Sequence, residues 1–249
     1  MERLLVINGC SHAAGSEIEA PGIGDSEECR NRSFGALLAK KLNRTPVHLA
    51  LPGGSNDWIY RSTAAWLGDN RQRIENKEVD VLFLIHWTGA ERFEYRFWQP
   101  YKTDHINYKH DNYYRSISIG TDQDFQGEDR LIFKTFCKMF VNGKNYWSDN
   151  KIKNIIALQS LLKSFNCNYW FGNAFDTFFE TPTYHSMIKL LDKRYFPHYD
   201  NNKLAYYWYC KNHGFNNQDP TNRFWHLNGQ AHEFYSIWLH KEINNAGLD

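Results

Sequence analysis

The segment LLVINGCSHAAG occupies residues 4–15 and is the part of the sequence that decides the fold. Its first four residues form a continuous apolar run that stops at Asn8, which is typical of a fully buried strand in a parallel sheet. The glycines that follow permit a tight turn into a helix. Further strands are predicted at residues 47–51, 79–85 and 167–171.

Amphipathic segments alternate with these strands. Helices are predicted at residues 33–42, 55–66, 150–165 and 229–243, where apolar residues recur at helical spacing. Alternation of strands and helices favours βαβ units and a parallel sheet. Residues at about 90–145 break this rhythm with many aromatic and charged side chains. We interpret them as an aromatic-rich insertion within a single domain that covers residues 1–249.

Composition limits the classes of function. The chain has 249 residues, 42% of them hydrophobic, and a formal net charge of +1, which favours a packed globular core. A near-neutral charge disfavours binding driven by nucleic-acid phosphates, which normally requires a basic excess. We therefore expect no nucleic-acid partner.

The cysteines and histidines indicate neither a metal site nor a disulfide framework. The five cysteines are scattered and contain no CxxC pair, which fits free thiols in a reducing compartment. His12 and His86 lie near the expected site, but two histidines without a spaced carboxylate or cysteine are a poor metal signature. We expect no metal and no cofactor.

No membrane-targeting segment is recognisable. The apolar run near the N-terminus is only four residues long and is followed at once by Asn8. It is too short for the apolar region of a signal peptide, and no stretch is long and apolar enough to span a bilayer. A cytoplasmic protein that does not associate with membranes is the expectation.

Four polar segments follow the predicted strands or open the last helix. They are residues 9–15 (GCSHAAG), 51–57 (LPGGSND), 86–88 (HWT) and 226–232 (HLNGQAH). In an open parallel sheet, ligands bind where the strands end at their carboxyl side, so all four segments can meet at one edge. Taken singly, each segment also fits an ordinary turn, a helix cap or a surface histidine.

The order of these segments resembles the SGNH (GDSL-like) hydrolase superfamily. In that family a GDSxxxG block holds the nucleophile, Gly and Asn blocks supply the oxyanion hole, and a late DxxHP block supplies the base. Here residues 9–15 keep both glycines and the serine, with Cys10 in place of the aspartate. Residues 53–56 are similar to the second block, and residues 226–232 are similar to the late run of the family. The resemblance identifies the chain as a divergent member.

Membership of this family implies a flavodoxin-like three-layer α/β/α sandwich with a parallel sheet of about five strands. It also implies roles for particular residues: Ser11 as nucleophile, His226 as general base, and an oxyanion hole formed by Ser11, Gly53, Gly54 and Thr88. Thr88 stands where the family has an asparagine, and its hydroxyl can donate one hydrogen bond.

The carboxylate that orients the base departs from the family pattern. Arg223 occupies the position three residues before His226 where the family has aspartate. Asp219 lies four residues further back and is the expected substitute. A backbone carbonyl is the alternative, and it would leave a Ser–His dyad.

The implied activity is serine-dependent ester hydrolysis through an acyl-enzyme. A carbohydrate O-acetyl ester is the preferred substrate, and the expected partner is a small-molecule or glycan ester. Two alternatives remain open: a catalytically impaired domain of the same fold that binds a glycan or a partner protein, and an acyltransferase that uses the same residues.

Overall fold

The computed structural model describes residues 1–96, 114–118, 130–131, 134–135, 138, 144–175, 184–217 and 226–249. Much of the predicted insertion at about 90–145 therefore lies outside the described residues, and so does Asp219. Within the described part of the chain, no helix combines the length and apolar character needed to cross a membrane.

Four parallel strands form the central sheet. They are β1 (Glu2–Asn8), β2 (Thr45–His48), β3 (Val79–Trp87) and β6 (Asn168–Asn173), arranged in the order β2-β1-β3-β6. The described residues thus give four strands in this sheet, whereas about five were predicted. The chain moves from β1 outward to β2 and then back to β3 on the other side of β1. This reversal creates a switch point between β1 and β3, where α/β proteins bind their ligands.

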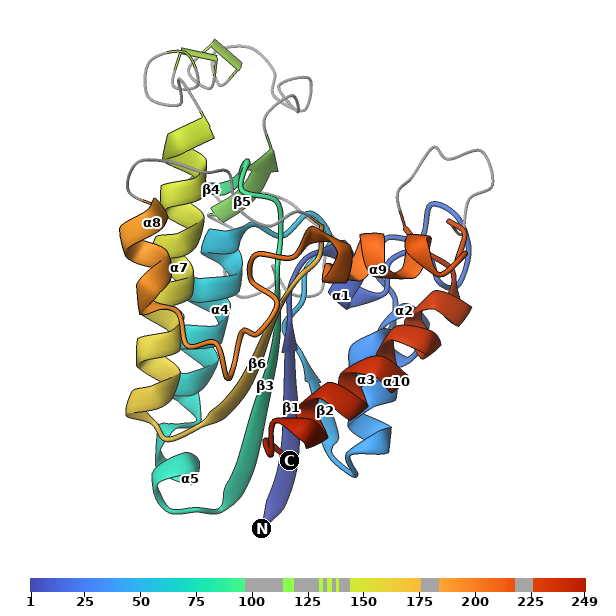
Figure 1. Cartoon of the computed structure of the whole chain (residues 1–249), viewed down its shortest axis with the longest axis vertical. Helices are drawn as coiled ribbons and strands as arrows, with labels where there is room; N and C mark the ends of the chain where they lie inside the picture. The colour runs from blue at the N-terminus through green and yellow to red at the C-terminus, as the bar shows by residue number, and fades with distance from the viewer. Residues whose placement is uncertain are drawn as a thin grey trace.

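Helices cover both faces of the sheet, as predicted (Figure 1). One face is covered by α4 (Asn56–Asp69) and α7 (Lys144–Ser164), and the other by α3 (Phe34–Lys41) and α10 (Gly229–Asn245). The remaining helices are short: α1 (Ser11–Ala14), α2 (Glu27–Asn31), α5 (Arg71–Glu75), α8 (Tyr184–Met187), α9 (Tyr206–Asn212) and the 3-10 turns Ile188–Leu190 and Asn202–Leu204. The fold is a three-layer α/β/α sandwich.

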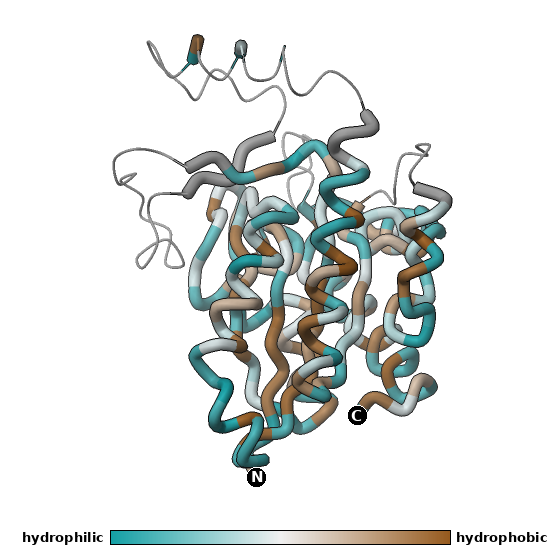
Figure 2. The backbone as a smooth tube through the Cα atoms, turned by 90° about the vertical axis from the view of Figure 1, so that its left-hand side faces the viewer, coloured by the Kyte–Doolittle hydropathy of each residue, from teal (hydrophilic) through white to brown (hydrophobic). Residues whose placement is uncertain are grey.

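Alternation along β1 divides the hydrophobic core into two clusters. Leu4 and Val6 pack with α4 and α7, while Leu5 and Ile7 pack with α3 and α10. All four side chains are buried, because helices cover both faces. Figure 2 shows hydrophobic segments concentrated inside the described part and hydrophilic segments at its lower edge, by the N-terminus.

A small antiparallel hairpin stands apart from the main sheet. It consists of β4 (Arg92–Arg96) and β5 (Tyr114–Ser118). It begins shortly after the carboxyl end of β3, and the N–H of Glu94 donates to Asp57 Oδ2 in α4 at 3.0 Å. The described part of the predicted insertion is therefore attached beside the carboxyl edge of the sheet.

Candidate active site

The polar segments that follow β1, β2 and β3 meet at the carboxyl edge of the sheet. Backbone hydrogen bonds and the side chain of one asparagine join them. The Leu51 N–H donates to the Gly9 carbonyl at 3.1 Å, joining the segments after β1 and β2. The Thr88 N–H donates to Asn56 Oδ1 at 3.1 Å, and Asn56 Nδ2 donates to the Gly89 carbonyl at 3.0 Å. The segments after β2 and β3 are therefore joined as well, around the switch point between β1 and β3.

A glycine at the end of β1 makes the sharp turn into α1. Gly9 has φ +157°, and a Cβ at this position would lie 2.7 Å from Ala13 Cβ and 2.9 Å from the His86 carbonyl oxygen. No larger residue fits there without displacing the backbone of β3. Cys10 is the N-cap residue of α1, and Ser11 is the first residue of that helix.

Ser11 is nearly buried at this edge, with 6% of its surface exposed. Neither its N–H nor its Oγ makes a hydrogen bond with another described residue, and no bond joins Ser11 to His226. Catalytic hydrogen bonds are often long in proteins without a bound substrate and shorten when the substrate binds.

A buried carboxylate orients His226. His226 Nδ1 lies 2.9 Å from Glu17 Oε2, and the Glu17 side chain is only 3% exposed. The other carboxylate oxygen accepts the Gly22 N–H at 2.9 Å. A carboxylate accepts hydrogen bonds, so the proton of the imidazole lies on Nδ1 and the lone pair on Nε2. This is the tautomer that a general base requires.

The pKa of His226 is set by opposing effects. Burial lowers the pKa below its ordinary value of 6.5; the hydrogen bond and charge of Glu17 raise it, and the positive charge of Arg92 lowers it. The net shift is downward, so the imidazole is neutral at neutral pH and can accept a proton.

Glu17 was missed by the sequence analysis, which looked for the carboxylate near His226 and selected Asp219. Glu17 lies 209 positions away in the sequence, but only six residues after Ser11. Its backbone adopts φ +66°, which is uncommon for a residue other than glycine. An acidic residue close behind the glycine-flanked block of the nucleophile is a signal that the sequence did offer.

The four predicted oxyanion donors differ in availability. The Gly54 N–H already donates to the Leu51 carbonyl at 2.8 Å. The Gly53 N–H has no such acceptor in the described part of the chain, and neither does the N–H of Ser11. Thr88 Oγ1 is fully buried and has no hydrogen-bond partner among the residues described. Ser11, Gly53 and Thr88 are therefore free to donate, and Gly54 is not.

His12 lies beside His226 in an aromatic environment. The two ring centroids are 5.3 Å apart, and the Phe175 ring lies 4.4 Å from His12 on another side. Burial lowers the pKa of His12 well below 6.5, which keeps the ring neutral. No group of three potential metal ligands occurs in the described ranges.

Asn173, the last residue of β6, is a further polar residue at this edge that the sequence analysis did not select. Asn173 pairs in register with Trp87, the residue before Thr88. Its amide is buried, and neither amide atom has a partner within the described ranges. A polar residue that ends a strand next to β3 was the available signal.

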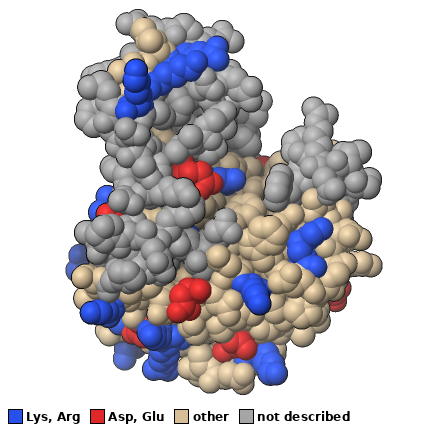
Figure 3. Space-filling model, turned by 45° about the horizontal axis from the view of Figure 1, so that its top comes forward, with Lys and Arg blue, Asp and Glu red and all other residues tan. Residues whose placement is uncertain are grey.

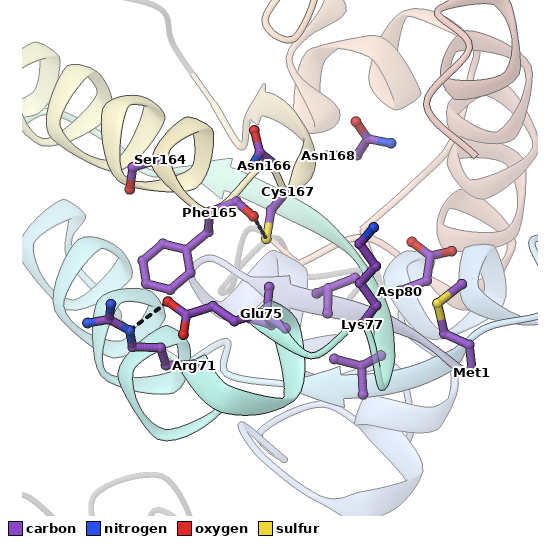
Figure 4. A pocket seen from close by; sticks show the side chains of 13 residues that line it. Met1, Arg71, Glu75, Lys77, Asp80, Ser164, Phe165, Asn166, Cys167 and Asn168 are labelled. Carbon is purple, nitrogen blue, oxygen red and sulfur yellow. Dashed lines mark hydrogen bonds and ion pairs between the residues drawn. The ribbon is translucent and has the colours of Figure 1, made fainter.

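The carboxyl end of the sheet comes forward in Figure 3, and a cavity lies at the opposite end. The described surface in this view is mostly tan, with blue and red residues at several places. At the opposite, amino end of the sheet lies a cavity of about 740 Å³ that Ser164, Cys167 and Asp80 help to line (Figure 4). Burial raises the pKa of Cys167 to about 11, so its thiol is a poor nucleophile near neutral pH. The residues expected to be catalytic lie at the carboxyl edge, away from this cavity.

The fold and these contacts define an α/β/α sandwich protein with a Glu–His pair and, at the carboxyl edge of its sheet, a serine hydroxyl that no other described residue hydrogen-bonds. A family model matches residues 16–188, and the chain belongs to that family, the family of unknown function DUF6071. Among curated proteins, none matches this sequence.

Two solved structures with similarity to the chain are esterases. One is a carbohydrate esterase whose active site is described as displaying divergent catalytic and non-catalytic binding functions; it has 13% identity and a TM-score of 0.45. The other is the acetyl xylan esterase Est2A from the rumen bacterium Butyrivibrio proteoclasticus, with 12% identity and a TM-score of 0.47. The alignments cover 98% and 100% of this chain but only 68% and 65% of the two esterases.

Proposed function

We propose that this protein is a serine-dependent ester hydrolase of the SGNH type, with Ser11 as nucleophile, His226 as general base and Glu17 as the carboxylate that orients the base. The observation that supports the proposal most is the 2.9 Å hydrogen bond between the buried Glu17 carboxylate and His226 Nδ1. It leaves Nε2 with a lone pair at the same edge of the sheet as Ser11, whose hydroxyl has no hydrogen-bond partner among the residues described. A base that is oriented by a third group, at the same sheet edge as a serine hydroxyl, is the arrangement that activates a serine nucleophile.

The reaction takes two steps. His226 Nε2 accepts the proton of Ser11 Oγ while Oγ attacks the ester carbonyl carbon, and a tetrahedral oxyanion forms. The bond to the alcohol then breaks, and His226 gives its proton to the leaving alkoxide oxygen. Water attacks the acyl-Ser11 ester in the same way, with its proton passing to His226, and the carboxylic acid leaves as Ser11 regains its proton.

Donors for the oxyanion come from the ends of three strands. The N–H groups of Ser11 and Gly53 and the hydroxyl of Thr88 are the members of the predicted set that no other described residue occupies. Preorganised donors of this kind stabilise the charge that develops on the carbonyl oxygen. The proposed substrate is a carbohydrate O-acetyl ester.

A catalytically impaired binding domain is the second candidate. It is favoured by one observation: no hydrogen bond joins Ser11 to His226 within the residues that the structure describes. A domain of this kind would use the polar side chains at the carboxyl edge to bind a ligand without converting it chemically. The two candidates differ in whether the Ser11 hydroxyl is needed for any chemical change.

The test compares rates of 4-nitrophenyl acetate hydrolysis by the wild-type protein, Ser11→Ala and Ser164→Ala. Ser164 is an exposed serine at the end of α7, at the opposite end of the sheet, so it serves as the matched control. We expect Ser11→Ala to lose at least about 10³-fold in kcat and Ser164→Ala to lose nothing. Equal rates in the three proteins would remove the hydrolase proposal and favour the binding domain.

A further inference from the structure

Arg92 is a partly buried cation next to the candidate site. It is the first residue of β4 and follows Thr88 by four positions. Its Nη1 atom is buried and makes no hydrogen bond with any described residue. Its guanidinium carbon lies 5.8 Å from the centre of the Phe175 ring.

Ring contacts connect Arg92 to the proposed base. Phe175 lies against His12 with a centroid distance of 4.4 Å, and His12 lies 5.3 Å from His226. The positive charge of Arg92 also lowers the pKa of both histidines, so the guanidinium is near enough to act on them electrostatically. Arg92 therefore belongs to the same end of the molecule as the Glu17–His226 pair.

Other arginines with little exposed surface in this protein have a carboxylate partner. Arg44 is paired with Asp80 at 2.9 Å, and Arg30 is paired with Asp25 at 2.8 Å. For Arg92, no carboxylate of the described ranges lies within ion-pair distance. Glu17, the acid of the site, already serves His226 and the Gly22 N–H.

An arginine without a described carboxylate partner beside a reactive site has a specific chemical use. Arg92 is partly buried, and a desolvated charge without a compensating partner is costly, so a bound anion would stabilise this guanidinium. The guanidinium presents a planar fork of N–H donors that fits the two oxygens of a carboxylate or a phosphate. A neutral sugar hydroxyl would leave the charge uncompensated.

We propose that Arg92 binds an anionic group of the ester substrate, so that the substrate class of this site is esters that carry a carboxylate or phosphate. The proposal rests on the hydrolase function proposed above and names its specificity. The carboxylate and phosphate share the same recognition chemistry, and the two are distinguished by experiment.

The test uses three aryl acetates that differ only in the para substituent. They are 4-acetoxybenzoate, its neutral analogue 4-acetoxybenzamide, and 4-acetoxyphenyl phosphate. The proteins are the wild type, Arg92→Gln, Arg92→Lys and the control Arg71→Gln, which removes an exposed arginine paired with Glu75 at the other end of the sheet. Comparing each variant with the wild type cancels the intrinsic reactivity of each ester.

We expect the ratio of kcat/KM for the preferred anionic ester over the amide to fall about 10-fold to 100-fold in Arg92→Gln. Arg92→Lys should recover part of this ratio because it keeps the charge but loses the fork, and Arg71→Gln should keep the wild-type ratio. The anionic ester whose kcat/KM ratio over the amide falls further in Arg92→Gln identifies the group, carboxylate or phosphate, that Arg92 binds. If kcat/KM in Arg92→Gln falls equally for all three esters, or if the ratio of anionic ester to amide is unchanged, the proposal is overturned.

Binding measurements separate this proposal from the hydrolase function. In the wild type, 4-hydroxybenzoate or 4-hydroxyphenyl phosphate should bind at least about 10-fold more tightly than 4-hydroxybenzamide, as measured by calorimetry. If no ester is hydrolysed but this anion preference is present and is lost in Arg92→Gln, the anion site stands and the hydrolase function fails. If esters are hydrolysed without any anion preference, the hydrolase function stands and the Arg92 site fails.

Discussion

Replacing Glu17 by glutamine should disable the base while leaving the fold intact. Glu17 Oε1 accepts the Gly22 N–H and Oε2 accepts from His226 Nδ1, both at 2.9 Å. In the Glu17→Gln variant, the carbonyl oxygen of the new amide must keep the bond to Gly22, so the amide nitrogen faces Nδ1. Two donors cannot face each other, and the imidazole proton moves to Nε2, the atom that must accept the proton of Ser11. A wrong tautomer of this kind costs about 10⁴ in kcat in serine hydrolases.

The pH profile distinguishes this orienting role from a merely structural one. The base works when it is neutral, so the acid limb of kcat in the wild type should have its midpoint below pH 6.5, the ordinary pKa of histidine. The Glu17 hydrogen bond and charge raise the pKa of His226, and their removal should move the midpoint to still lower pH. The assay is ester hydrolysis across a pH range of about 4 to 8 on both sides of that midpoint, with circular dichroism to verify folding.

Glu19→Gln is the matched control for this experiment. Glu19 lies in the same loop, is exposed, and accepts a hydrogen bond from the Ser26 hydroxyl at 2.8 Å. It should keep the wild-type rate and midpoint. A folded Glu17→Gln protein with a rate within about threefold of the wild type, or a midpoint that moves to higher pH, would show that Glu17 does not orient the base.

Three further outcomes are expected. Thr88→Val should lower kcat of ester hydrolysis about 10²-fold to 10³-fold with little change in KM, while Thr88→Ser keeps most of the rate; a pure KM effect would contradict the oxyanion role. Burial lowers the pKa of both His86 and His232 to about 3, so below pH 6.5 the unfolded chain binds protons that the folded protein does not. Urea unfolding should therefore show a loss of up to about 1.4 kcal/mol per pH unit for each histidine as the pH falls from about 6.5 toward about 3, and a flat profile would contradict it. Asp249→Asn should lower the free energy of unfolding by about 1–2 kcal/mol because the buried Arg44 donates to that carboxylate at 2.8 Å, and an unchanged urea midpoint would show that the ion pair contributes nothing.

The strands were predictable because a strand buried on both faces is a nearly continuous run of apolar residues. The predicted strands at residues 4–7, 79–85 and 167–171 fall largely within β1, β3 and β6. The second strand was predicted at residues 47–51 and occurs at Thr45–His48. The start of β2 was hard to recognise because of Pro46. Proline is normally excluded from strands but is tolerated in β2, which lies at the edge of the sheet.

Helix ends were predicted well where capping residues mark them. Ser33 and Ser55 cap α3 and α4, each accepting a backbone N–H in the first turn. The α7 helix starts at Lys144, whereas the prediction started at residue 150. Its first six residues, KNYWSD, carry no apolar periodicity, so pattern alone gave no reason to extend the helix.

The site was only partly predictable, because its pairing depends on tertiary structure. Motif order placed the segments of Ser11, Gly53 and Thr88 at one edge of the sheet, and the hydrogen bonds between these segments agree with that placement. The contact between Glu17 and His226 joins segments 209 residues apart, so the position of Glu17 behind the nucleophile block did not show which residue it would contact. The exclusion of Gly54 as a free donor likewise required the geometry of the turn.

Covalent labelling shows whether Ser11 is an activated nucleophile. A fluorophosphonate probe reacts with an activated serine and mimics the tetrahedral intermediate, whereas an unactivated hydroxyl reacts poorly near neutral pH. Peptide mass spectrometry of the labelled native protein should show a single adduct on Ser11, absent from His226→Ala and from heat-denatured protein. A folded protein without an adduct, or with the adduct on another serine, would contradict the account.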